Sequence, residues 1–199
     1  MTFGGLGHNP FNPALVGRVF LLIAYPVQMT SFPQPTMSGY VDALSGATPL
    51  AAVKAAAAKA DGAISLANVD LLNMFSGAMP GSMGEIAAMA LLVGGIFLLW
   101  RKVITWHIPV AFIGTVFVLS FLLDGFSFTN ALSWVLSGGL FLGAFFMATD
   151  YVTSPHATVP KLIFGVGAGV ITVLIRFYGN LPEGVSYAIL LMNILNPYI

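Results

Sequence analysis

"LIFGVGAGVITVLIRFY", residues 162–178, decides the fold class of this chain. Its apolar side chains follow one another without the alternation of a half-buried strand, which favours a helix. With a rise of about 1.5 Å per residue, roughly 20 such residues cross the ~30 Å hydrocarbon core of a bilayer. The small residues of GVGAG, 165–169, would let a second helix approach closely. We therefore expect a membrane-spanning helix here.

Five other stretches share this apolar character. In lipid, only helices or closed barrels satisfy the backbone polar groups, and continuous hydrophobicity selects helices. The sequence therefore predicts an all-α integral membrane protein with about six transmembrane helices, in a single membrane domain over residues 1–199. We expect the first and last stretches, which are short and flanked by Pro and Asn, to be tilted or partly broken. The six predicted spans are residues 13–29, 83–100, 103–123, 131–148, 162–178 and 184–197.

The composition agrees with a membrane protein and excludes several functions. Hydrophobic residues make up 58% of the 199 positions and charged residues 7%, far below the quarter that is usual in soluble domains. Seven basic and seven acidic residues cancel, which gives no electrostatic basis for binding nucleic acid. With no cysteine and three scattered histidines, the sequence predicts no disulfide, iron–sulfur cluster or metal site. A redox role would need an organic cofactor.

The basic residues indicate an orientation in the membrane. Four of them fall on one side when the predicted spans are counted, and the positive-inside rule makes that side cytoplasmic. The segment 30–82 is then an extramembrane loop on the outer face, with Asp124 on the same side. Arg176 does not fit, because it lies near the outer end of its span. The four cytoplasmic residues are Arg18, Arg101, Lys102 and Lys161.

Two polar hairpins, GHNPFNPA at 7–14 and TDYVTSPHATVPK at 149–161, resemble one another. Each contains an Asn-Pro or Ser-Pro step, which suits an N-cap followed by the first helical turn. Broken helices at separated positions are typical of inverted-repeat membrane folds, in which half-helices meet near the midplane. Two ordinary Pro-rich loops would explain the same pattern, and the sequence leaves both interpretations open.

One water-soluble stretch, VDALSGATPLAAVKAAAAKADG at 41–62, interrupts the apolar chain. Thr48-Pro49 predicts a helix start, with Thr48 as N-cap and residues 50–60 as an alanine-rich helix. The Thr48 hydroxyl would then lie where unpaired backbone N–H groups favour a phosphate. A capping threonine on a surface helix is the alternative interpretation.

These residues carry a resemblance to a known family. DALSGAT, 42–48, resembles the Asp-x-x-Ser-Gly-Ala-Thr signature at which a flavin transferase joins FMN to threonine. The whole chain resembles RnfD, a membrane subunit of the Rnf complex, and its relative NqrB, from the sodium-pumping NADH:quinone reductase. The family usually has Pro where Tyr151 stands. The matching stretches are FGGLGHNPFNPALVGR (3–18), SGATPL (45–50), WHIPVAFIGT (106–115), GGLFLGAFFMATDYVTSP (138–155) and IRFYGNLPEGVSYAILLMNILNP (175–197).

The resemblance implies covalent FMN, attached through its phosphate to Thr48. Asp42, Ser45, Gly46 and Ala47 would form the motif that the flavin transferase recognises. The chain would be a subunit, with no catalytic residue of its own, of an ion-translocating ferredoxin:NAD oxidoreductase, and other Rnf subunits would be its partners. It would be a multi-pass protein of a bacterial or archaeal inner (cytoplasmic) membrane, with the flavin loop outside. Compared with the family, several N-terminal spans are expected to be missing.

Coupling to Na⁺ or H⁺ would require polar groups within or beside the spans, where they are costly and therefore functional candidates. For each such group a structural role, as a helix cap or at the interface, is the alternative. We expect residues 9–13 and 149–155 to form the centre of the fold and to contact a second, non-covalent flavin. A passive channel or small-solute transporter without flavin, or a membrane scaffold, would also suit such hairpins. The candidates are Asn9, Asn12, His107, Asp124, Asp150, Ser154 and Arg176.

Overall fold

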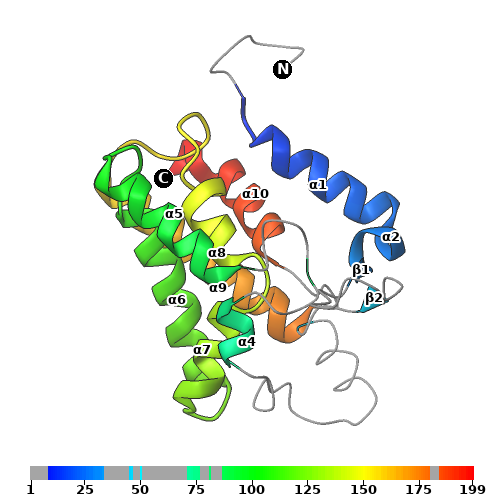
Figure 1. Cartoon of the computed structure of the whole chain (residues 1–199). Coiled ribbons are helices and arrows are strands. Elements are labelled where there is room, and N and C mark those ends of the chain that lie inside the picture. Colours follow the sequence, from blue (N-terminus) through cyan, green and yellow to red (C-terminus); the bar gives the residue numbers. More distant parts are fainter. Residues whose placement is uncertain are drawn as a thin grey trace.

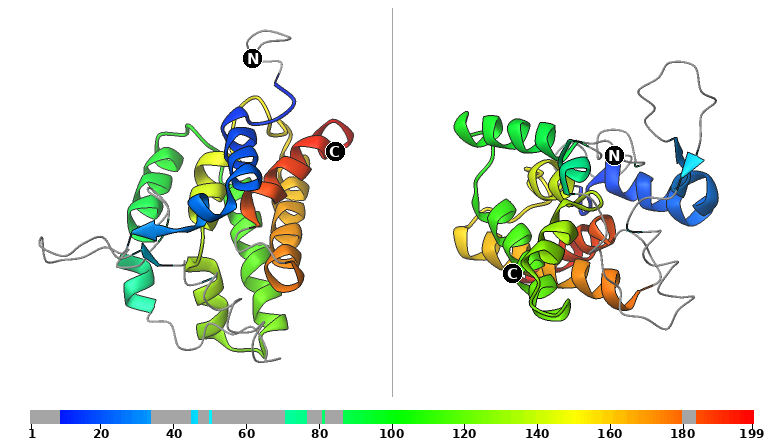
Figure 2. Two further views of the ribbon diagram at one scale, coloured as in Figure 1. Left: turned by 90° about the vertical axis from the view of Figure 1, so that its right-hand side faces the viewer. Right: turned by 60° about the horizontal axis from the view of Figure 1, so that its bottom comes forward.

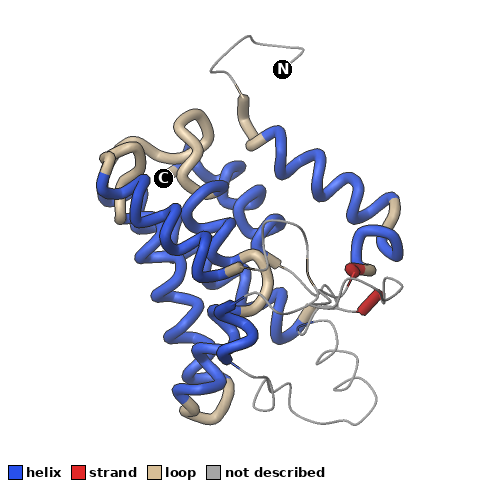
Figure 3. Tube along the Cα trace, viewed as in Figure 1, coloured by secondary structure: helices blue, strands red, loops and turns tan. Residues whose placement is uncertain are grey.

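Helices form almost all of the regular secondary structure in the computed structural model (Figure 3). The structure describes residues 9–33, 45–46, 50, 71–76, 81, 87–179 and 184–199. The predicted all-α class is confirmed, apart from one pair of two-residue strands. The helices are α1 (Pro13–Ala24), α2 (Pro26–Thr30), α4 (Leu71–Ser76), α5 (Ala88–Trp100), α6 (His107–Leu123), α7 (Phe128–Leu136), α8 (Leu140–Leu142), α9 (Thr158–Tyr178) and α10 (Val185–Leu195), with a π-helix at Gly143–Met147 and a 3₁₀ turn at Asn196–Tyr198.

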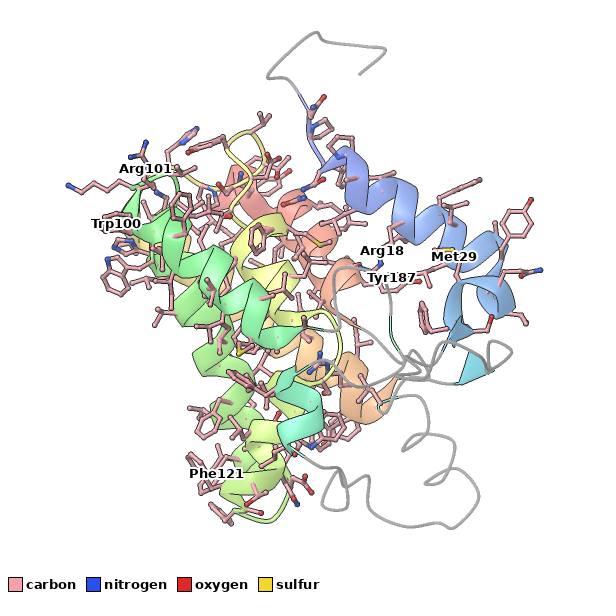
Figure 4. All side chains as sticks on the ribbon, viewed as in Figure 1. Arg18, Met29, Trp100, Arg101, Phe121 and Tyr187 are labelled. Atoms are coloured by element: carbon pink, nitrogen blue, oxygen red, sulfur yellow. The ribbon has the colours of Figure 1, made fainter. Side chains whose placement is uncertain are left out.

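The N-terminal helix begins as the sequence predicts. Asn12 is its N-cap, and the Asn12 side-chain oxygen accepts from the backbone N–H groups of Ala14 (3.0 Å) and Leu15 (3.4 Å). Pro13 occupies the first helical position, where no N–H is needed. The helix ends at Ala24, because Pro26 cannot donate to the preceding turn and starts α2 instead. Arg18, expected near the membrane surface, lies in the middle of α1 beside Tyr187 (Figure 4).

A short antiparallel pairing joins the end of this region to the water-soluble segment. Strand β1 (Phe32–Pro33) pairs with β2 (Ser45–Gly46), with Phe32 opposite Gly46 and Pro33 opposite Ser45. Most of the predicted loop 30–82 lies outside the described residues. Within the described part, α4 is a helix that the sequence did not predict, and it packs against α5 and α7.

Each of the six predicted spans contains a helix, but few of these helices are long. Within the described ranges, α9, with 21 residues, is the one helix that is long and apolar enough to cross a membrane alone. The second candidate is a broken span, in which α7 and Leu140–Met147 meet at a bend of 65°. Helices α1, α5 and α6 are apolar but shorter, at 10–17 residues. The number of crossings therefore stays a prediction.

The centre of the molecule is the pair α6 and α9, which lie side by side (Figures 1 and 2). A methyl group added at Gly165 would lie 2.7 Å from Ala111 Cβ, and one at Gly169 would lie 2.7 Å from Thr115 Cβ. The backbone of α6 is also close, since Phe112 O would lie 3.2 Å from a Cβ at Gly169. Small residues four apart thus bring two helices together, as expected from GVGAG.

The connecting loops gather at two opposite ends of the helices. The turn 101–106, the hairpin 149–157 and the end of α10 lie at the upper end in Figure 1, and the turn after α6 lies at the lower end. Large apolar side chains such as Phe20 and Val93 are exposed on the outer faces between these ends. Exposed apolar faces of this extent are typical of a protein that is surrounded by lipid.

The second hairpin does not start a helix at its Ser-Pro step, contrary to the sequence prediction. The backbone N–H of Ser154 donates to Asp150 O (3.0 Å), which closes a turn, and α9 starts four residues later, at Thr158. Its N-cap is Ala157, which has no side-chain acceptor. Asp150 does not cap a half-helix either, because its carboxylate accepts from Thr153 Oγ1 (3.0 Å).

Candidate functional site

The structure describes the chain on both sides of Thr48 in the DALSGAT motif, 42–48. Asp42, Ala47 and Thr48 lie outside the described residues. On one side, the backbone of Ser45 and Gly46 forms strand β2. On the other side, Leu50 has a helical conformation, in line with the predicted helix start, and its side chain is 1% exposed.

Leu50 is anchored at a break in the helices. Between α7 and α8 the chain passes through Gly138, whose φ of +63° few side chains adopt. A Cβ placed at Gly138 would lie 3.0 Å from Arg176 Nη2 and 3.7 Å from Leu50 Cδ2. The side chains of Leu50 and Arg176 therefore converge on this glycine, which brings Leu50 near a buried guanidinium.

Arg176 holds the break together. It lies in the last turn of α9 and is 1% exposed. Its Nη1 donates to Trp134 O (2.6 Å), and its Nη2 donates to Ser137 O (2.9 Å). These carbonyls are at the C-terminal end of α7, where the helix dipole favours a positive charge. The sequence marked Arg176 as an exception to the charge pattern, and this contact explains why a cation is placed here.

Asp124 has a structural partner in the same region. It caps the C-terminal end of α6, and its Oδ2 accepts from Trp134 Nε1 (2.9 Å). Trp134 is fully buried against Phe177, with ring centroids 4.7 Å apart. Trp134 thus contacts Asp124 through its indole and Arg176 through its backbone carbonyl, at the C-terminal end of α7. The helix-cap interpretation of Asp124 fits this geometry, and Asp124 lies away from the two hairpins.

The two polar hairpins contact one another, but they lie at one end of the helices and not at the centre of the fold, where the sequence analysis expected them, because α6 and α9 occupy the centre. Asn12 Nδ2 donates to Met147 O (3.4 Å), at the end of the π-helix before the second hairpin. Asn9 and Thr153, one from each hairpin, line a common pocket of about 340 Å³. That volume falls within the range of small-molecule sites, about 300–1,000 Å³. The rest of the lining comes from neighbouring residues and the end of α10: Pro10, Phe11, Val152, Asn193, Ile194, Asn196 and Pro197.

Asn193 is the most unusual residue of this pocket. It is 3% exposed, and neither its Nδ2 nor its Oδ1 has a hydrogen-bond partner among the described residues. A buried amide without partners is costly, about 1–3 kcal/mol, so native proteins normally satisfy such groups with water or a ligand. Its neighbour Asn196 is satisfied, since its Nδ2 donates to Thr153 O (3.1 Å). Asn193 thus belongs to the lining of the pocket, while its unpartnered Nδ2 and Oδ1 are buried behind the pocket surface.

The remaining candidates do not join this pocket. Ser154 is buried and lines a separate pocket of about 60 Å³ with His156 and Lys161. His107 stacks on Trp106, with ring centroids 4.3 Å apart. Within the described ranges, no three His, Cys, Asp or Glu side chains come close enough to hold a metal ion.

Sequence reasoning missed two of the site residues. Asn193 is a lone amide in the apolar run LLMNIL, 190–195, and such an isolated polar residue in a span is a signal that could have been used. The break at Gly138 is marked by SGG, 137–139, within the predicted span 131–148. Two adjacent glycines inside an apolar stretch also indicate a helix break.

The comparisons with known proteins cover the whole chain. Residues 1–199 match the model of the NQR2, RnfD, RnfE family. The chain is 43% identical over 208 aligned residues to the D subunit of the proton-translocating ferredoxin:NAD(+) oxidoreductase complex of Clostridium ljungdahlii, covering all of this chain and 61% of that protein. It is 42% identical over 197 residues to the D subunit of the Na(+)-translocating ferredoxin:NAD(+) oxidoreductase complex of Acetobacterium woodii, covering 99% of this chain and 58% of that protein. It is 38% identical over 210 residues to the D subunit of the ion-translocating oxidoreductase complex of Pseudomonas paraeruginosa, covering 99% and 61%. The chain thus spans about three fifths of the length of these relatives.

Proposed function

This chain belongs to the NQR2, RnfD, RnfE family, and on that premise we propose that it is a membrane subunit of an ion-translocating ferredoxin:NAD oxidoreductase. Relatives named as the D subunits of such complexes, at about 40% identity over nearly the whole chain, support this role. In it, the chain relays electrons between other subunits of an Rnf complex and takes part in coupling that relay to the transport of Na⁺ or H⁺. Iron–sulfur clusters and the NAD site belong to those other subunits.

The relay uses FMN that is covalently attached to Thr48. The support is the DALSGAT motif at 42–48, together with the placement of its neighbours. Leu50, two residues after Thr48, is buried against the Gly138 break, close to the Arg176 guanidinium. A fixed positive charge there favours an anionic phosphate or a reduced, anionic flavin. The flavin supplies the one- and two-electron chemistry, and the protein supplies position and charge.

The pocket between the hairpins accepts a second, non-covalent flavin. The imide edge of an isoalloxazine ring presents a donor beside an acceptor, and a rotation of the buried Asn193 side chain into the pocket would offer that edge its unpartnered Nδ2 and Oδ1. The apolar members of the lining, Phe11 and Val152 among them, suit the flat face of the ring.

The maturation and location of the chain follow from this role. A flavin transferase recognises Asp42, Ser45, Gly46 and Ala47 and attaches FMN to Thr48. The protein lies in the inner membrane, with the flavin segment on the outer face and the turn containing Arg101 on the cytoplasmic face.

The first prediction tests the covalent flavin. We expect the chain, produced with its flavin transferase, to give a band that fluoresces under ultraviolet light in a denaturing gel, and Thr48→Ala to abolish that band. Thr36→Ala is the matched control, since it removes a nearby threonine outside the motif and should leave the band unchanged. Mass spectrometry of the peptide that contains Thr48 should show the added mass of FMN.

An unmodified Thr48 in the native chain would contradict the proposal. A colourless chain that passes small solutes in vesicles would support the channel alternative instead. A Thr48→Ala chain that stays fluorescent would place the attachment at another residue.

The second prediction tests the non-covalent flavin separately. Asn193→Leu removes the free donor and acceptor, and we expect the flavin released by denaturing the purified complex to fall by one per chain. The Thr48-linked fluorescence should stay. Replacing an unpartnered buried amide with an apolar group of similar size is nearly neutral or stabilising, so thermal stability of the flavin-free chain should not fall.

Thr172→Val is the control for this change. It also removes a buried polar group, whose hydroxyl donates to Ala168 O, but Thr172 does not line the pocket. Unchanged release of flavin from Asn193→Leu would refute the second flavin site while leaving the covalent flavin unaffected.

A further inference from the structure

Positive charges gather at one end of the described helices. Arg101 and Lys102 form the exposed turn after α5, where Lys102 takes the left-handed conformation with a φ of +56°. Lys161, in the first turn of α9, lines a pocket of about 60 Å³ together with Val103 from that turn. The adjacent cations Arg101 and Lys102 and the sequence-distant Lys161 therefore border one surface, which we call the basic end.

Two loops are tied together beneath these charges. The Tyr151 hydroxyl donates to Val103 O, which joins the hairpin 149–157 to the turn 101–106. The pocket between them is also lined by Thr105, Ser154 and His156, whose side chains carry hydrogen-bond donors. Such donors, next to Lys161, suit the oxygens of a phosphate.

Little negative charge opposes these cations in the part of the chain that the structure describes. Its two acidic side chains are Asp124 and Asp150. Asp124 is in the turn after α6, at the other end of the molecule, and bonds to Trp134. Asp150 is nearer, but its carboxylate accepts from Thr153 Oγ1, on the side of the pocket between the hairpins.

Aromatic side chains surround the basic end. Trp100 is 76% exposed, Trp106 is 56% exposed and Tyr151 is 65% exposed. Figure 4 shows Trp100 and Arg101 next to one another, far from Phe121 near the opposite end of α6. Exposed Trp and Tyr in a membrane protein are typical of the headgroup level, where an apolar ring meets a polar layer.

An apolar surface continues directly from this end. On α5, Val93, Ile96 and Phe97 are each more than half exposed, and they precede Trp100 on the same helix. A ligand that bound here would thus meet cations first, then aromatic rings, and then an apolar face one or more helical turns long.

We propose that the basic end binds an anionic phospholipid, with its phosphate held by Arg101, Lys102 and Lys161 and its acyl chains along α5. Charge complementarity alone would also suit an acidic protein segment. The order of cation, aromatic ring and apolar face favours a lipid, which has the same order along its length. The proposal does not depend on the flavin at Thr48.

The test uses the native tryptophans of the full chain in lipid vesicles. Of the three in the sequence, Trp100 and Trp106 are exposed at the basic end, while Trp134 is fully buried. Two vesicle preparations contain phosphatidylcholine with a minor share of phosphatidylglycerol. In one preparation the phosphatidylglycerol has brominated acyl chains, which quench tryptophan fluorescence, and in the other the phosphatidylcholine has them. We expect brominated phosphatidylglycerol to quench the fluorescence beyond its share of the lipid.

The decisive variant is the double substitution Arg101→Gln, Lys102→Gln. Attraction of a basic residue to anionic lipid corresponds to roughly fivefold binding per charge, so the preference should fall by about that factor for each charge removed. Lys54→Gln, Lys59→Gln removes the same total charge from the segment 41–62 and should keep the preference. Circular dichroism and an unchanged melting temperature show that a variant is folded.

Three outcomes would overturn the proposal. Quenching in proportion to lipid share would show that no anionic lipid is selected. An equal loss in both double variants would show that only net charge matters. A wild-type chain that shows no lipid preference, but is protected at Lys102 from amine-reactive labelling in the purified complex, would assign the basic end to a protein partner.

Discussion

At the scale of single residues, the break at Gly138 has the sharpest requirements. A side chain there would have to adopt a φ of +63°, and its Cβ would lie 3.0 Å from Arg176 Nη2. The guanidinium cannot move away freely, because it donates to the carbonyls of Trp134 and Ser137. The packing of α7, α8, α9 and the Leu50 side chain at this break therefore requires a residue without a side chain at position 138.

The third prediction follows from this contact. Gly138→Ala should cost about 1–2 kcal/mol for the left-handed backbone, and further stability because the two bonds of Arg176 are distorted. Gly125→Ala is the matched control. Gly125 has a φ of +70°, but a Cβ there would meet nothing within 4 Å, so it should cost only the backbone term.

Thermal unfolding in detergent, followed by tryptophan fluorescence, measures the difference. The melting temperature of Gly138→Ala should lie clearly below that of Gly125→Ala. Equal losses would show that the Arg176 contact contributes nothing to stability, and the anchoring of Leu50 at this break would then lose its support.

Single residues also show what a sequence can and cannot predict. Asn12 was predicted as an N-cap because its role is local, fixed by the neighbouring Pro13 and the following turn. The partners of Arg176 could not be predicted, since Trp134 and Ser137 are 42 and 39 positions away along the chain. The unpartnered state of Asn193 depends on packing in the same way.

At the scale of elements, the packing of α9 against α6 carries the fold. Gly165 and Gly169 lie on one face of α9, and a Cβ at either position would lie 2.7 Å from a side-chain atom of α6. Without a strong hydrophobic drive in lipid, such close packing supplies much of the attraction between helices.

The fourth prediction compares glycines on the two partner helices. Gly169→Ala should destabilise the protein by about 1–3 kcal/mol, because its Cβ would lie 2.7 Å from Thr115 Cβ and 3.2 Å from the fixed carbonyl of Phe112. Gly114→Ala, on α6, meets nothing within 4 Å and should stabilise by about 0.5–1 kcal/mol through helix propensity. Thermal unfolding should therefore show a lower melting temperature for Gly169→Ala and a higher one for Gly114→Ala, and this difference in sign makes the test specific. A stabilised Gly169→Ala would mean that the helices are not in close contact.

Element boundaries were predicted less well than element types. Continuous hydrophobicity located a helix in all six stretches, but the stretch 131–148 is bent by 65° between Phe128–Leu136 and Leu140–Met147. Hydrophobicity reports whether a residue can lie in lipid, and it does not report the direction of the backbone. The Ser154-Pro155 step failed as a helix start for a related reason, since a turn that closes onto Asp150 O satisfies the same local preferences.

At the scale of the whole molecule, the loops divide between two ends of different chemistry. One end has the exposed cations Arg101 and Lys102, and the other has Asp124 in the turn after α6. The positive-inside rule predicts that the first end faces the cytoplasm. A direct measurement of which end faces the cytoplasm tests this prediction.

The fifth prediction tests the orientation in the membrane by thiol labelling. The sequence contains no cysteine, so a single introduced thiol gives an unambiguous label. Lys102→Cys and Phe126→Cys are a matched pair, because both positions are exposed, follow a helix and have a positive φ, +56° and +60°. In cells whose outer membrane or cell wall has been removed while the cytoplasmic membrane stays intact, a membrane-impermeant maleimide should label Cys at position 126 and not at position 102. After lysis both should react, because both are accessible to water. Labelling at 102 in intact cells would invert the topology, and labelling at both positions would mean that α6 does not cross the bilayer. Neither result would affect the helix packing. The inverted topology would move the flavin segment to the cytoplasmic side, and labelling at both positions would remove the basis for assigning that segment to a side.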